Sequence, residues 1–537
     1  MSRDIDAVTL EIVRNQFESV AEEMGQVLIT SSYSPNIKER RDCSTALFDA
    51  DGRLVAQAEH IPVHLGAMPE AVDTVLEYDP RPGDVFVLND PFEGGTHLPD
   101  VTMVSPVAVD GETLGFAVSR AHHADVGGMT PGSMPAGARE IYQEGIRLPP
   151  VRLVSGGEVN DDVMRLLLAN VRNPSERRAD VRAQIAANER AEERLGDLVD
   201  EHGRDRIVAA FDAVIDYSRD RVTAELADLP NGELGARDVM EGDGVTDDEI
   251  PIKVTVTVED ERIEVDFAGT APQVAGNVNA PVAVARSAVY FVIRCVTDPE
   301  IPPNQGCYDP ISVSVPEGSL LNPRPPAAVV GGNVETSQRV TDVVFTAFAE
   351  AAPDRVPAQG QGTMNNLTIG SRSGGGDGFT YYETIAGGFG GRPTKDGLDG
   401  VQVGMTNTLN TPVEALEAEY PLFVEEYGLR EDSGGRGEHR GGLGVVRSVR
   451  VEADATVSLL TERRRVAPRG IAGGEDGATG VNRIGGEVVP AKTTRDVAAG
   501  TTVAVLTPGG GGHGSPDDRD PEAVKRDRAD EKTEWKE

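Results

Sequence analysis

Hydrophobic positions in the first third of the chain follow a helical period and then a strand period. In residues 5–32, apolar side chains recur every three or four positions, which predicts one long amphipathic helix that closes before Pro35. Residues 45–57 alternate around an Asp-Gly pair, a pattern typical of a β-hairpin. A helix is predicted at 68–78, followed by strands in DVFVLND, VTMVSPVAV and LGFAVSRAH. This region therefore predicts helices and strands mixed along the chain.

The middle of the chain has a helical pattern, and the last part is rich in glycine. The helical period runs from Asp161 to about Asp228, with a break at Asn173-Pro174. Strands resume in IKVTVTVEDERIEVDFAG, an apolar helix follows in VAVARSAVYFVIRCV, and another helix is predicted from about Ser337. Beyond Pro353 glycine dominates, and short strands are predicted at 363–370, 379–385, 401–406, 445–452 and 455–460.

These patterns predict an α+β fold with several mixed or antiparallel sheets and a helical insert at about 160–228. A chain of 537 residues exceeds the size of a single core. We expect an N-terminal α+β region that carries the candidate site, a helical region, a second α+β region, a glycine-rich β-dominated region and an acidic disordered tail. Their boundaries are predicted at 1–160, 161–240, 241–355, 356–514 and 515–537.

The chain carries a formal net charge of −38, and the tail explains little of it. Residues 515–537 hold nine acids against six bases, or about −3, which leaves about −35 on the remainder. An acidic, lysine-poor surface fits a cytoplasm at molar salt, where the Debye length shrinks to about 3 Å. We therefore expect an extreme halophile. The charge argues against nucleic acid as a partner, because phosphate contacts need clustered lysine and arginine.

Several common targeting and catalytic patterns are missing from the sequence. No apolar run is long enough for a membrane span, and the acidic start MSRDID does not resemble a signal peptide, so we expect a cytoplasmic protein that contacts no membrane. The cysteines form no C-x-x-C pair. There is no G-x-x-x-x-G-K-[ST] loop and no G-x-S-x-G elbow. Any ATP is therefore expected to bind elsewhere.

The candidate chemistry lies in NDPFEGGTHLPD (89–100) and AHHADVGG (121–128). Three of the eight histidines fall within 27 residues there. His97 and Asp100 share one tight loop, and His122 or His123 would supply a third ligand from a neighbouring strand end. Adjacent residues on a strand point to opposite faces, so we expect only one of the pair to reach the site. Two imidazoles and a carboxylate predict a divalent Zn, Mn or Fe ion, and the alternative is that these histidines cap loops.

Motifs along nearly the whole chain, about residues 5–515, resemble those of the hydantoinase B/oxoprolinase family. They are NDPFEGGTHLPD, AHHADVGG, PGSMPAGAREIYQEGIRLPP, GGNVETSQRVTD, TNTLNTPVEALEAEYPLFVEEYGLREDSGGRGEHRGGLG and TPGGGGHG. The resemblance implies a hetero-oligomer in which a separate A-type subunit, of actin-like ATPase fold, binds ATP and phosphorylates a carbonyl oxygen. It also implies that this chain completes the reaction at one divalent metal, with His97, Asp100 and His122 as the ligands.

The implied reaction is the opening of a phosphorylated hydantoin or 5-oxoproline ring by metal-activated water. Asp125, Glu144 and Asp90 are candidates for the general base or for orienting a ligand imidazole. His60 and His64 are expected to line a pocket or pack. The alternatives are acetone-carboxylase-like carboxylation of a phosphorylated ketone enolate and a non-catalytic scaffold for the ATPase subunit. A non-haem iron oxygenase is disfavoured, because its usual first pair is His-x-Asp/Glu.

Overall fold

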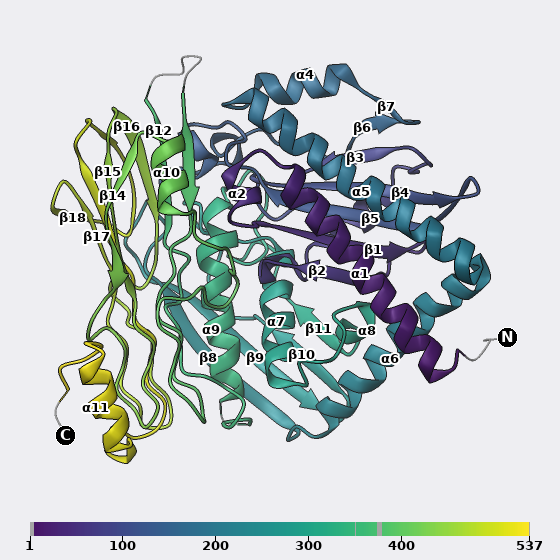
Figure 1. Cartoon of the computed structure of the whole chain (residues 1–537). Helices are drawn as coiled ribbons and strands as arrows, with labels where there is room; N and C mark the ends of the chain where they lie inside the picture. The colour runs from purple at the N-terminus through teal and green to yellow at the C-terminus, as the bar shows by residue number, and fades with distance from the viewer. Residues whose placement is uncertain (1–4, 350, 373–377, 536–537) are drawn as a thin grey trace.

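The computed structural model describes residues 5–349, 351–372 and 378–535 (Figure 1). Its helices are α1 (Ala7–Ser31), α2 (Pro35–Lys38), α3 (Met68–Leu76), α4 (Asp161–Ala169), α5 (Pro174–His202), α6 (Arg204–Ala227), α7 (Val282–Val296), α8 (Gln305–Tyr308), α9 (Ser337–Phe348), α10 (Val413–Glu419) and α11 (Pro521–Ala529). Its strands are β1 (Cys43–Asp49), β2 (Leu54–Glu59), β3 (Val85–Leu88), β4 (Asp100–Val109), β5 (Glu112–His122), β6 (Val151–Ser155), β7 (Glu158–Val159), β8 (Gly232–Met240), β9 (Ile250–Glu259), β10 (Arg262–Asp266), β11 (Ile311–Ser314), β12 (Asn366–Ser371), β13 (Thr380–Glu383), β14 (Leu422–Leu429), β15 (Val445–Val451), β16 (Ala455–Leu460), β17 (Val481–Ile484), β18 (Glu487–Val489), β19 (Lys492–Val497) and β20 (Thr502–Leu506). The predicted α+β fold is confirmed.

An antiparallel sheet in the N-terminal half, here called the N-terminal sheet, has the strand order β2-β1-β5-β4-β3-β6-β7. Its two faces are both covered, because side chains on both faces of its strands are apolar. On one face, Leu47 and Ala117 pack against α1, α5 and α6. Figure 1 shows α1 and α5 crossing this face. On the other face, Phe48 and Val118 pack toward α3 and the interior.

The helices α7 and α9 form the central layer of the molecule. Their apolar faces, which include Val289 and Val344, join the N-terminal sheet to a second sheet with the order β11-β10-β9-β8. In this second sheet β10 and β11 pair in parallel, so the sheet is mixed. Figure 1 shows α7 and α9 standing between the N-terminal layers and the C-terminal strands. The apolar core around α7 and α9 therefore contains residues of the first three predicted regions, 1–160, 161–240 and 241–355.

Two further sheets in the C-terminal part face each other as a β-sandwich. Their orders are β13-β12-β16-β19 and β14-β15-β20-β17-β18. Alternating apolar residues from the two sheets meet in one core, for example Ile369 and Val457 from the first and Val449 and Val503 from the second. The sandwich gives this region a hydrophobic centre of its own.

Glycine-rich segments at one end of the sandwich lie side by side as extended chains. We call residues 387–391, 434–444, 470–477 and 509–514 the glycine bundle. Backbone hydrogen bonds join the segments, including Gly442 N to Phe389 O (2.7 Å), Gly510 N to Gly442 O (2.9 Å) and Gly391 N to Gly511 O (2.8 Å). A Cβ added at Gly510 would lie 2.1 Å from the carbonyl oxygen of Phe389. Glycine is required here because the backbones approach closer than any side chain permits.

The acidic tail differs from our expectation of disorder. It forms a helix, α11, that begins at Pro521 with the side chain of Asp520 accepting from the Glu522 amide. Arg519 pairs with Asp396 at 2.8 Å and with Asp527 at 2.6 Å. It also donates to the Glu438 carbonyl at 2.9 Å, which ties the tail to the glycine bundle. Figure 1 shows α11 at the end of the long extended segments. The many acids of the tail are thus partly matched by arginines in fixed positions.

Most elements predicted from hydrophobic period are present at the expected places. The long N-terminal helix, the hairpin at 45–57 and the helix from Ser337 correspond to α1, to β1 with β2, and to α9. The strand predicted at 401–406 is not formed, since only Val401 makes an isolated bridge, to Gly387. No helix among the described residues is both long and apolar enough to cross a membrane.

We predict that Gly510→Ala destabilises the fold by at least about 3 kcal/mol, because the new methyl group overlaps the Phe389 carbonyl and the paired segments must separate. The measurement is the free energy of unfolding from denaturant titration. Gly428→Ala is the matched control, since a Cβ there meets nothing within 4 Å. Equal stabilities of the two variants would contradict the close-packing account.

Candidate metal centre

The pairing of β4 with β5 brings Asp100 and His122 together. Asp100 begins β4 and His122 ends β5, and the two residues are direct cross-strand partners. Cross-strand partners on one face of an antiparallel pair lie within about 5.5 Å. The His122 Nδ1 atom is 3.0 Å from Asp100 Oδ1. Strand register alone therefore places one imidazole beside one carboxylate.

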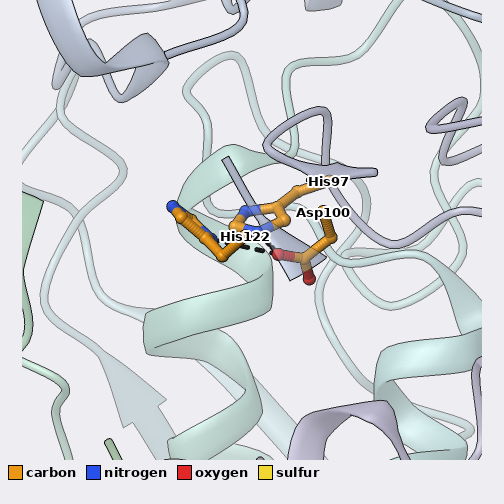
Figure 2. A group of neighbouring side chains, drawn as sticks. All are labelled: His97, Asp100 and His122. Carbon is orange, nitrogen blue, oxygen red and sulfur yellow. Dashed lines mark hydrogen bonds and ion pairs between the residues drawn. The ribbon is translucent and has the colours of Figure 1, made fainter. Parts of the chain in front are cut away.

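His97 reaches the same oxygen from the loop before β4. Its Nε2 atom is 2.8 Å from Asp100 Oδ1, and its Nδ1 atom is 3.4 Å from the carbonyl oxygen of Val330. The loop turns tightly enough for the Asp100 amide to donate to the His97 carbonyl at 3.1 Å. Gly95 permits this turn, because a Cβ there would lie 2.6 Å from the Asn89 carbonyl oxygen. Figure 2 shows the His97 and His122 rings converging on Asp100.

The second oxygen of Asp100 is held by different groups. Oδ2 accepts hydrogen bonds from Thr96 Oγ1 at 3.0 Å and from Asn333 Nδ2 at 3.3 Å. The Nε2 atom of His64 is 3.4 Å from the same oxygen, and the His64 Nδ1 atom lies 2.9 Å from Ser44 Oγ. The carboxylate is thus anchored through Oδ2, which leaves Oδ1 directed at His97 and His122.

Protonation of the cluster favours metal ligation. Burial by itself raises the pKa of Asp100, but His97, His122 and His64 hold the pKa well below its ordinary value, so the carboxylate is ionised. Burial lowers the pKa of His97 more than Asp100 raises it, so this imidazole is neutral near pH 7. A negative oxygen and neutral imidazoles are the forms that bind a divalent cation.

The donor set and its spacing fit one divalent ion. One nitrogen from each of His97 and His122 and one oxygen from Asp100 lie within 4.8 Å of one another. Ligands on opposite sides of an ion with bonds of about 2.1 Å stand about 4 Å apart, so the cluster is close to this spacing. The Nε2 atom of His122 is buried without a hydrogen-bond partner among the described residues. The residues present therefore suit a metal with nitrogen and oxygen ligands.

His123, the alternative third ligand, belongs to a different contact. Its Nε2 atom is 2.9 Å from Gln184 Oε1 on α5, on the other side of the sheet. Burial, followed by the charge of Arg177, lowers the pKa of His123 to about 4. The structure brings His97, Asp100 and His122 together and places His123 among core contacts, as strand alternation requires.

The three carboxylates considered as general bases are engaged elsewhere. Asp90 pairs with Arg147. Asp125 accepts from the amides of Gly127 and Gly132 and from Arg172. Glu144 accepts from the amides of Val329 and Val330, and burial raises its pKa to about 8. Through these hydrogen bonds Glu144 fixes the segment that contains Val330, whose carbonyl faces His97. A general-base role for Asp90, Asp125 or Glu144 stays a prediction.

Two residues that contact Asp100 were not predicted from the sequence to belong to the centre. His64 was expected to line a pocket or pack, yet it contacts Asp100 Oδ2. Asn333 lies in GGNVETSQRVTD, a motif that contributed to the family resemblance without an assigned role. It comes from a π-helical turn, Gly332–Thr336, that precedes α9. Sequence separations of 36 and 233 residues from Asp100 hide both contacts from local pattern analysis.

Comparison with known proteins relates the chain to a defined family. Residues 6–516 match the hydantoinase B/oxoprolinase family. 5-Oxoprolinase 1 from Arabidopsis thaliana is 42% identical over a match that covers 95% of this chain and 42% of that protein. A putative B-type subunit of a D-/L-hydantoinase from Pseudomonas sp. strain NS671 is 33% identical, with 98% of this chain and 93% of that protein covered.

A solved structure shows the same fold. The ATP-dependent caprolactamase from Pseudomonas jessenii superposes with a TM-score of 0.90 at 29% identity, covering 99% of this chain and 95% of that one. The family match extends over nearly the whole chain and confirms the resemblance drawn from the motifs. The chain belongs to the hydantoinase B/oxoprolinase family. It spans less than half the length of the Arabidopsis protein.

Adjacent buried histidines give a direct test of the metal ligands. We expect His122→Gln to lower the affinity of the purified chain for Zn²⁺ or Mn²⁺ at least about 100-fold, because one of three nitrogen and oxygen ligands is lost. His123→Gln, at the next position along the backbone and equally buried, should leave the affinity unchanged. The measurement is the amount of metal that each variant retains after dialysis. Equal losses in the two variants would contradict the assignment.

The raised pKa of Glu144 predicts a pH dependence. Between about pH 4.5 and pH 8 the folded protein keeps a proton on Glu144 that the unfolded chain releases, so this group lowers stability as pH rises through that window. We expect Glu144→Gln to be more stable than the wild type by at least about 2 kcal/mol at pH 8 and similar to it at pH 4.5. Denaturant titration at both pH values, with the exposed Glu158→Gln as control, measures this. A difference in unfolding free energy between Glu144→Gln and the wild type that is the same at both pH values would contradict this prediction.

Proposed function

We propose that this chain is the B-type subunit of an ATP-dependent cyclic-amide hydrolase. In this role it opens the ring of a hydantoin or 5-oxoproline that a partner subunit has phosphorylated. The observation that carries the proposal is the buried cluster of His97, Asp100 and His122 in a chain of the hydantoinase B/oxoprolinase family. Three relatives in that comparison are named for 5-oxoproline, a hydantoin and caprolactam, which are all cyclic amides.

The chain's own residues would prepare the site for hydrolysis. Asp100 brings a fixed negative charge, and His97 and His122 bring two nitrogen ligands. Thr96 and Asn333 keep the carboxylate from rotating, because both donate to Oδ2. When bound, a divalent cation supplies Lewis-acid charge and lowers the pKa of a coordinated water, which suits attack on an amide carbon. The near-complete burial of the cluster keeps competing bulk water out.

An A-type ATPase subunit is part of the same proposal. The sequence has no G-x-x-x-x-G-K-[ST] loop to cradle ATP phosphates. The Pseudomonas NS671 relative is named as one subunit of a hydantoinase, and more than half of the Arabidopsis 5-oxoprolinase lies outside the match to this chain. These facts support a complex in which ATP binds the partner and the phosphorylated amide reaches this chain.

The test is ring opening by the assembled complex. The chain is expressed with an A-type subunit and supplied with ATP, Mg²⁺, a divalent transition metal and hydantoin, 5-oxoproline or caprolactam. The opened acid is measured by mass spectrometry. We expect His97→Ala to lose at least about 100-fold in rate, because a ligand is removed. His202→Ala, at the distant end of α5, should match the wild type.

The outcomes also separate the alternatives. Full ring opening by the His97→Ala complex would mean that this chain acts as a scaffold for the ATPase. Bicarbonate-dependent consumption of a ketone, with no cyclic amide opened by the wild type, would mean carboxylation. Either result contradicts the proposed hydrolase.

A further inference from the structure

The π-helical turn Gly332–Thr336 presents two buried polar side chains close to the candidate metal centre. Asn333 donates to Asp100 Oδ2. Glu335, two residues later, is also fully buried but points to other partners. Gly332 lets the turn approach its surroundings closely, since a Cβ there would lie 1.9 Å from the Asn279 carbonyl oxygen. Short π-helical turns inside helices are frequent at functional sites because they redirect side chains.

Glu335 begins a chain of hydrogen bonds that crosses into the C-terminal sandwich. Its Oε1 atom accepts from the Met364 amide at 3.1 Å and from Asn366 Nδ2 at 2.8 Å. The Asn366 Oδ1 atom in turn accepts from the Tyr382 hydroxyl at 2.9 Å. Asn366 also donates to the Leu460 carbonyl at 2.9 Å, so its amide is held on both sides. The hydroxyl of Tyr382 therefore has one fixed position.

The ring of Tyr382 lies flat against His122. Their centroids are 4.6 Å apart and their planes differ by 15°. The Arg40 guanidinium lies 5.4 Å from the Tyr382 ring centroid and donates to the Tyr382 carbonyl at 3.0 Å. Stacked rings resist rotation of either plane, because rotation loses contact area. The imidazole of His122 is thus stacked on a tyrosine ring whose hydroxyl is held by Asn366.

We propose that Tyr382 is a positioning residue for the candidate ligand His122, and that Asn366 and Glu335 hold Tyr382 in place. Its ring would fix the plane of the imidazole so that the ring nitrogens keep their direction toward Asp100 and the ion. The proposal rests on the metal centre of the proposed function. It adds to that centre residues of β12 and β13, which lie more than 240 residues along the chain from His122. Residues around metal ligands commonly act by orienting the ligand rings.

A neighbouring tyrosine provides a matched control. Tyr381 is as buried as Tyr382, and its hydroxyl also makes a 2.9 Å hydrogen bond, to Glu383 Oε2. Replacement of either tyrosine by phenylalanine removes one buried hydroxyl and keeps the ring. A merely structural role for Tyr382 predicts the same outcome for Tyr381→Phe and Tyr382→Phe.

The experiment titrates the full-length wild type and both variants with Co²⁺ and follows the visible absorption of the bound ion. We expect Tyr382→Phe to weaken Co²⁺ binding about tenfold and to shift the absorption bands, because the imidazole plane becomes less restrained. Tyr381→Phe should bind like the wild type. Both variants should lose similar amounts of thermal stability. Equal affinities and spectra in the two variants would overturn the proposal.

A double variant tests whether the residues act along one chain. We expect Asn366→Leu alone to weaken Co²⁺ binding about as much as Tyr382→Phe, and the two together to weaken it no further. Additive losses would mean that Tyr382 acts without its tether and would overturn the roles of Asn366 and Glu335. If the wild type binds no Co²⁺, Zn²⁺ or Mn²⁺, the metal centre of the proposed function fails together with this proposal. If the wild type binds the ion and Tyr382→Phe matches it, the positioning role alone fails.

Discussion

One ionised carboxylate in the interior determines how the parts of this protein must meet. A buried charge is tolerated only when it is paired or fully hydrogen-bonded. Around Asp100 this is achieved by a loop, two strands and a π-helical turn, which converge so that each carboxylate oxygen has its own partners. Arg120, whose pKa burial lowers to about 10, adds a positive charge that interacts with Asp100. The N-terminal sheet and the central helices therefore share one polar centre as well as one apolar core.

Much of the N-terminal half is predictable because its determinants are local. The long period of α1 and the Asp-Gly turn between β1 and β2 are visible within windows of about 25 residues. The cluster of His97, Asp100 and His122 is also visible, since His97 lies three residues before Asp100, which begins β4, and His122 ends the next strand, β5. Strand alternation anticipates that His122 and His123 diverge, although it does not say which of them faces Asp100.

The remainder depends on contacts between distant segments. His64, Asn333 and Tyr382 reach the centre from separate parts of the chain, and no period or spacing links them. The glycine-rich segments give no strand signal, because their regularity comes from backbone packing instead of alternating side chains. The tail was expected to be disordered from its charge. The tail is held in place by contacts such as the ion pair of Arg519 with Asp396, which lies more than 120 residues away in the sequence.

The pairing of Asp100 with His122 has a consequence for assembly. A slip of one residue between β4 and β5 would set an alanine or the wrong histidine opposite the carboxylate and turn every side chain of one strand to the other layer. Correct alignment of β4 with β5 and the pairing of Asp100 with His122 therefore form together. A misaligned hairpin would leave the Asp100 carboxylate buried without the imidazole that faces it in the correct register, and an unpaired buried charge is costly.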